Sequence, residues 1–135
     1  MAQLVLLPPT TITAAGTTTT TPVQLTDHVD AEVMLSAAFT YGSGGTSVNA
    51  YVQTTLDSGA TWFDIANFNF LLASAAKISE VASTTVAAAN YTPTDGTLAA
   101  NTVKDGLIGS ALRVKTIVVG TYAGNTSLSI TAVTR

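Results

Sequence analysis

Apolar and polar residues alternate with a period of two along much of this chain, and this alternation is the strongest constraint on its fold. It is clearest over residues 112–119 and 128–133. Successive side chains of a β-strand point to opposite faces of a sheet, so the period predicts strands with one buried face. The two segments flank a turn-rich stretch, residues 120–125, and we predict that they form a hairpin.

Similar alternation recurs in the middle of the chain. The further predicted strands are 31–41, 47–55, 61–70, 77–83 and 84–92. Residues 47–55 and 61–70 flank a short connection and are predicted to form a second hairpin. Residues 71–76 are rich in Ala and predict a short helical turn, and residues 93–109 predict a long loop with two Asp-Gly turns. Seven or eight short strands in 135 residues predict a single all-β domain, an antiparallel β-sandwich of jelly-roll type, with a barrel as the alternative strand order.

The first 25 residues have a composition of their own. They are rich in Thr, which favours extended backbone, and contain Pro8, Pro9 and Pro22, which lack backbone donors. We expect an extended N-terminal arm over residues 1–25 with one or two edge strands, followed by the sandwich over residues 26–135. The composition also fits a disordered low-complexity tail. Five apolar side chains favour an arm that docks on another protein surface: Leu4, Val5, Leu6, Leu7 and Ile12.

Charged residues are scarce. They form 10% of the chain, against about 25% in an ordinary globular protein. Such a surface suits a protein that contacts other subunits, because the cores of interfaces are depleted of charge. Five basic residues and a net charge of −3 argue against a nucleic-acid partner. No apolar run reaches the length of a membrane-spanning helix, and no basic segment opens a signal peptide, so we expect no membrane partner and synthesis in the cytoplasm without export.

Residues suited to catalysis or metal binding are also few. His28 is the only histidine and there is no cysteine, whereas a zinc site needs three or four ligands. A Ser-His-Asp triad would depend on His28, and the chain has no G-x-S-x-G motif. The sequence therefore predicts a protein that is not an enzyme and that holds no cofactor and no metal.

One short motif is specific. Residues 55–62, TLDSGATW, resemble the Asp-box, the S/T-x-D-x-G-x-T-W turn that recurs in the blades of sialidases and in unrelated β-proteins. We expect Asp57 to accept hydrogen bonds from turn amides, Gly59 to adopt a positive φ, and Trp62 to pack back over the turn. The box occurs once in this chain, so these three residues are predicted to form a structural turn.

Two longer segments carry a resemblance to a class of proteins. Residues 47–70, SVNAYVQTTLDSGATWFDIANFNF, and residues 113–135, RVKTIVVGTYAGNTSLSITAVTR, resemble small structural proteins of tailed bacteriophages. The resemblance implies a virion component built as a β-sandwich or jelly roll. Among such components we expect a capsid decoration (cement) protein, a homotrimer on the capsid surface that binds the major capsid protein.

Two other functions stay open at this point. A tail-tube, neck or head–tail connector protein would use the loop 93–109 to pair with the next subunit of a ring. A carbohydrate-binding module would stack Trp62, Tyr51 or Tyr41 on a sugar.

Overall fold

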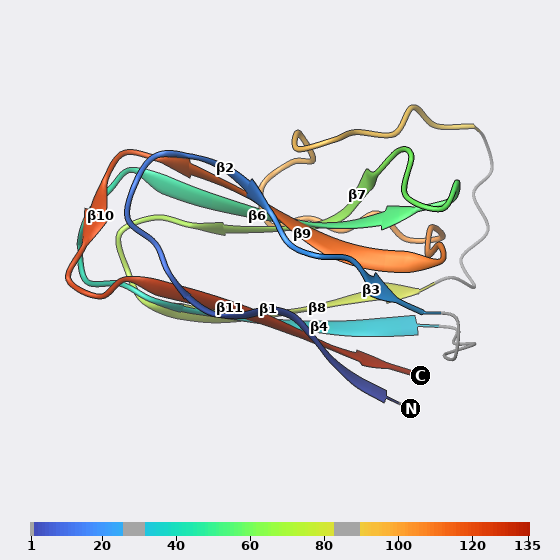
Figure 1. Cartoon of the computed structure of the whole chain (residues 1–135), viewed down its shortest axis with the longest axis horizontal. Coiled ribbons are helices and arrows are strands. Elements are labelled where there is room, and N and C mark those ends of the chain that lie inside the picture. Colours follow the sequence, from blue (N-terminus) through green and yellow to red (C-terminus); the bar gives the residue numbers. More distant parts are fainter. Residues whose placement is uncertain (1, 26–31, 83–89) are drawn as a thin grey trace.

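Two antiparallel sheets packed face to face form the molecule (Figure 1). The computed structural model describes residues 2–25, 32–82 and 90–135. The first sheet has the order β1-β11-β4-β8, with β1 at Ala2–Thr11, β11 at Ser127–Thr134, β4 at Glu32–Thr40 and β8 at Ala75–Ala82. The second has the order β2-β9-β6-β7, with β2 at Gly16–Thr19, β9 at Ala111–Val119, β6 at Ser47–Thr55 and β7 at Phe63–Phe70, and β3 at Val23–Gln24 also pairs with β9. The predicted all-β antiparallel sandwich is confirmed.

The central hairpin forms as the alternation predicts. Strands β6 and β7 pair from Val48 opposite Phe70 to Thr54 opposite Phe63, with an irregularity after Val52. The predicted helical turn at 71–76 is wrong, since β8 begins at Ala75 and no helix occurs in the described part of the chain. Accordingly, no helix among these residues has the length and apolar character needed to span a membrane.

The predicted hairpin of residues 112–119 and 128–133 does not form. Strand β9 pairs with β6, β2 and β3, whereas β11 pairs with β4 and β1 in the other sheet. Both strands have one apolar face, and two such faces are buried equally well side by side in one sheet or opposite each other across a core. The alternation predicts both strands correctly, but it does not specify whether the two strands pair in one sheet or face each other across the core.

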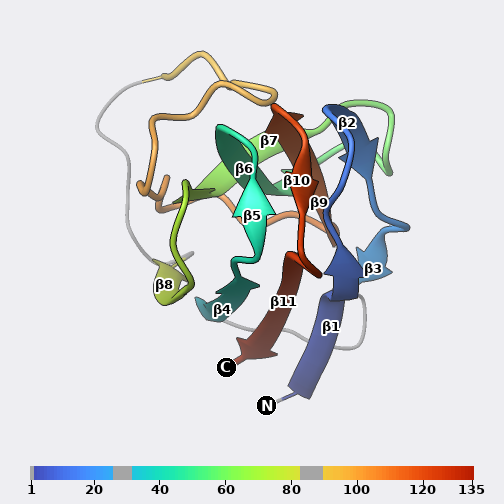
Figure 2. The ribbon, with the colours of Figure 1, turned by 90° about the vertical axis from the view of Figure 1, so that its left-hand side faces the viewer.

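Two connections between the sheets lie against each other at one end of the sandwich (Figure 2). Strand β5, Ser43–Gly44, follows β4, and strand β10, Tyr122–Ala123, follows β9; the two short strands pair with Tyr122 opposite Gly44. The Tyr122 ring is buried, lies edge-on to Phe39 at 6.1 Å, and its hydroxyl donates to the carbonyl of Leu71 at 3.0 Å. This aromatic side chain thereby closes the end of the core.

The predicted N-terminal arm is part of the sandwich. Strand β1 pairs with β11 from Ala2 opposite Thr134 to Thr11 opposite Ser127, and β2 and β3 belong to the second sheet. Pro8 and Pro9 lie at a register shift of the edge strand β1, where missing donors cost least. The division into an arm at 1–25 and a sandwich at 26–135 is therefore corrected: residues 2–25 contribute strands to both sheets.

The long loop after residue 90 covers one edge of the second sheet. Three backbone hydrogen bonds fasten it to β7: Asp64 N–H to Thr94, Asn67 N–H to Thr102, and Lys104 N–H to Ile65, at 2.8–2.9 Å. These bonds satisfy edge groups of β7 that would otherwise face solvent. The same loop brings its Asp95-Gly96 turn over the outer face of the sheet.

Candidate functional site

The Asp-box turn has the geometry that its sequence predicts. Asp57 accepts hydrogen bonds from the Thr61 backbone N–H at 2.8 Å, the Thr61 hydroxyl at 2.6 Å and the Thr55 hydroxyl at 2.9 Å. Gly59 has a φ of 95°, and the Trp62 indole N–H donates to its carbonyl at 3.1 Å. The bonds from Thr61 lower the pKa of the Asp57 carboxyl. Asp57, Gly59 and Trp62 thus build a rigid turn.

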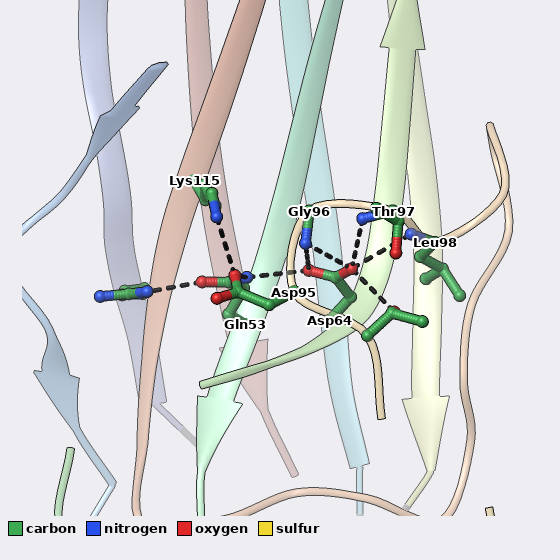
Figure 3. Close-up of polar contacts among 9 residues, drawn as sticks. Gln53, Asp64, Asp95, Gly96, Thr97, Leu98 and Lys115 are labelled. Atoms are coloured by element: carbon green, nitrogen blue, oxygen red, sulfur yellow. Dashed lines mark hydrogen bonds and ion pairs between the residues drawn. The ribbon is translucent and has the colours of Figure 1, made fainter. Parts of the chain in front are cut away.

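A second carboxylate holds the long loop. Asp64 is fully buried and accepts hydrogen bonds from the backbone N–H groups of Gly96, Thr97 and Leu98 at 2.8–3.1 Å and from the Thr94 hydroxyl at 2.8 Å (Figure 3). A buried charge is tolerated only when hydrogen bonds replace its hydration. Asp64 therefore fixes the loop against β7.

Gln53 links this carboxylate to the charged residues of the outer face. Its side-chain amide is fully buried and donates to Asp64 at 2.8 Å and to Asp95 at 2.6 Å, while its carbonyl accepts from Nε of Arg113 at 2.9 Å. Asp95 also forms an ion pair with Lys115 at 2.9 Å (Figure 3). The hydrogen bonds from Lys115 and Gln53 lower the pKa of Asp95. All the polar atoms of Gln53 are thus used within the protein.

An open groove of about 580 Å³ lies beside this network. Its walls are the Asp-box turn on one side and the loop at Pro93–Asp95 on the other, with Arg113 between them. The Arg113 guanidinium lies 4.5 Å from the centre of the Trp62 ring, an arrangement that favours a cation over the π-face. The lining residues are Gly59, Ala60, Thr61, Trp62, Phe63, Pro93, Thr94, Asp95 and Arg113.

The predicted sugar-stacking aromatics do not come together. Tyr51 is 7% exposed, and burial, followed by the charge of Asp64, raises the pKa of its phenol. Tyr41 lies by the paired sheet connections, where its hydroxyl donates to the Gly44 carbonyl at 3.0 Å. Of the three aromatic residues proposed for stacking, Trp62 alone lines the groove.

The five predicted docking residues occupy different environments. Leu6, Leu7 and Ile12 are 2%, 8% and 7% exposed and belong to the core, and Leu4 packs against that core. Val5 is 55% exposed. The docking role is therefore corrected for the three core residues, because a side chain already buried in its own sandwich offers no surface to a partner.

The outer face of the first sheet carries an uncharged patch over two rows of the strand register, and the row beyond it contains Glu80. One row of neighbours crosses all four strands: Val5, Thr131, Ser36 and Ile78. The next row continues with Ser129, Ala38 and Ala76. These seven residues, which we call the uncharged face, include Ile78, which is 73% exposed.

No cluster suited to metal binding emerges in the described ranges. They contain no group of three or more His, Cys, Asp and Glu side chains that could hold a metal ion. His28, with its neighbours Asp27 and Asp30, lies outside those ranges, as does most of the predicted strand 84–92.

Sequence reasoning did not identify Gln53, Asp95 or Arg113 as members of one site. Gln53 and Arg113 are directly opposite each other in the β6–β9 register, so both lie on the same face. Both are polar residues that alternate with apolar ones along their strands, and this pattern indicates the outer face of the sheet. Asp95 reaches them through the loop, and no spacing in the sequence indicates this contact.

Comparisons with known proteins provide no further assignment. No protein-family model matches the chain, and neither a curated protein nor a solved structure matches it.

Proposed function

We propose that this protein is a structural subunit of a tailed-phage virion, a capsid decoration protein that binds the major capsid protein through the uncharged face. The uncharged face is the observation that carries this proposal. A free monomer normally covers such an area with Lys and Glu, whereas an interface core is depleted of them. The position of these seven residues on four paired strands gives a partner a preformed surface.

The proposed docking contact differs from the one expected from the sequence, which lay in the N-terminal segment alone. Val5 remains available on strand β1, while the contact extends across the sheet to Ile78. A ligand that binds only the mature shell stabilises it by mass action. Three copies joined in the expected homotrimer would strengthen the contact through their high effective concentration.

The test compares two sets of variants. Under this proposal, heads assembled from the major capsid protein of the same phage are mixed with purified protein and sedimented. Wild-type protein should co-sediment, and the double substitution Ser36→Glu with Ile78→Glu should abolish co-sedimentation without lowering the melting temperature. Thr19→Glu is the matched control, because Thr19 is exposed on the other sheet. Equal co-sedimentation of the double variant and the wild type would disprove docking through this face.

The solution mass separates this proposal from its alternatives. Light scattering after size exclusion should give a trimer for a decoration protein. A ring of six or twelve copies would instead indicate a tail-tube, neck or connector protein, and a monomer that does not bind heads would favour an independent binding module.

A further inference from the structure

We infer that the groove between the Asp-box turn and the Pro93–Asp95 segment binds a neutral saccharide. The inference goes beyond the proposed virion role and does not depend on it. It rests on how the groove is built, on the hydrogen-bonding atoms that it presents, and on the balance of charge along its floor.

Both walls of the groove are fixed before any ligand arrives. Asp57 holds one wall through three hydrogen bonds within the turn. Asp64 holds the other wall by gathering the amides at residues 96–98 and the Thr94 hydroxyl. A preorganised site loses little conformational entropy on binding, which matters most for the weak polar contacts that a saccharide makes. The groove also has a volume within the ordinary range of small-ligand sites, about 300–1,000 Å³.

The floor offers donors and an acceptor side by side. Nε of Arg113 donates to Gln53, and among the described residues the two terminal amino groups of the guanidinium have no hydrogen-bond partner and can donate to a ligand. Oδ1 of Asp95 accepts from Gln53 and Lys115, and within residues 2–25, 32–82 and 90–135 Oδ2 accepts no hydrogen bond, so it can accept one from a ligand. A sugar hydroxyl both accepts and donates, so neighbouring hydroxyls can accept from Arg113 and donate to Asp95. Because the Arg113 guanidinium lies over the Trp62 ring, the apolar contact with the C–H face of the same sugar comes from Ala60, Phe63 and Pro93.

The charge of the floor selects against anions. The Arg113 and Lys115 cations are balanced by Asp95, which pairs with Lys115, and by the buried Asp64, and the chain carries a net charge of −3. A phosphate or a carboxylate bound to Arg113 would meet the Asp95 carboxylate at close range, where like charges repel. A neutral polyhydroxyl compound uses both groups and meets no such repulsion.

Trp62 is the only tryptophan of the chain, so its fluorescence reports on this groove alone. Purified protein is titrated with maltohexaose, cellohexaose and chitohexaose, and with hexagalacturonic acid as the charged comparison. At least one neutral oligosaccharide should produce a saturable change in emission, with an affinity at least fivefold higher than that of the acid. The absence of a saturable change with all three neutral probes would overturn the inference, and so would tighter binding of the acid.

Two variants test the assigned atoms. Asp95→Asn and Arg113→Gln should each weaken binding at least tenfold, while Asp105→Asn, which changes an exposed carboxylate bonded to the Ala82 amide instead, should bind as the wild type does. Melting temperatures verify that each variant is folded. Wild-type affinity in both groove variants would disprove the site. Head co-sedimentation is measured separately. Protein that binds heads but no saccharide would leave the proposed function intact. Protein that binds a saccharide but no heads would leave the saccharide site intact.

Discussion

The backbone N–H of Gly96 donates to both carboxylate oxygens of Asp64, at distances of 2.9 and 2.8 Å. The two residues belong to different parts of the chain, a strand of the central hairpin and the long loop. Since Asp64 is fully buried, its negative charge is stabilised by these amides and not by water. This pair makes the loop a fixed part of the second sheet and gives the groove its second wall.

The first prediction follows from this pair. Asp64→Asn replaces an acceptor-only group by one that must turn an N–H₂ toward several backbone amides. We expect a loss of about 3 kcal/mol in the free energy of unfolding, because a buried charged acceptor with several donors is replaced. Urea unfolding measures this loss. Asp105→Asn, at an exposed carboxylate that accepts from the Ala82 amide, should cost less than about 1 kcal/mol. Equal losses in the two variants would contradict the role assigned to Asp64.

The second prediction concerns the Asp-box turn and acid. The pKa of Asp57 in the folded protein lies below its ordinary value of 3.8. The ionised Asp57 therefore stabilises the fold above pH 3.8, and this stabilisation is lost as the pH falls through the folded pKa. Asp57→Asn should lower the melting temperature by a few degrees at pH 7. The difference from the wild type should shrink as the pH falls below 3.8, as measured by thermal unfolding. A difference that grows in acid would contradict this assignment.

The third prediction concerns two carboxylates on the first sheet. A shared hydrogen bond with Glu32, and then its charge, raise the pKa of Glu80 above its ordinary value of 4.5. A raised folded pKa means that stability is complete below pH 4.5 and falls as the pH rises through the folded value. Glu80→Gln keeps a hydrogen-bond donor and removes the repulsion, so it should raise the melting temperature at pH 7. At pH 4 the gain should largely vanish, and a lower melting temperature of Glu80→Gln at pH 7 would refute the prediction.

The fourth prediction tests the paired sheet connections. A Cβ atom on Gly42 would clash with the carbonyl oxygens of Ala123 and Gly124, which belong to the opposite connection. Gly42→Ala should therefore destabilise the protein by about 3 kcal/mol in chemical denaturation. Gly16→Ala provides the comparison: its Cβ would meet open space, and its φ of 148° should cost about 1 kcal/mol. A neutral Gly42→Ala variant would show that the two connections are free to separate.

The sequence predicted those features that local chemistry determines. The β6–β7 hairpin and the Asp57 turn depend on alternation and turn residues within a few positions of one another. The docking of Gly96 on Asp64 was not predicted, because the two residues are 32 positions apart and no periodicity connects them. The pairing of β9 and β11 was predicted incorrectly, since each strand carries a single apolar face and alternation does not encode which sheet it joins. Leu6, Leu7 and Ile12 were predicted to contact a partner. Apolar residues in a Thr- and Pro-rich segment can be buried in the same domain or against another protein, and composition does not distinguish the two.

The pairing of β1 with β11 bears on how the chain acquires its structure. Ala2 lies opposite Thr134, a separation of 132 positions, so the first strand gains its neighbour only when the last strand is available. Contacts of such high sequence separation slow folding, because a long loop must close before they contribute. Until then, the apolar side of β1 stays exposed to other nascent chains. During synthesis on the ribosome, this first strand is therefore the segment most exposed to mispairing.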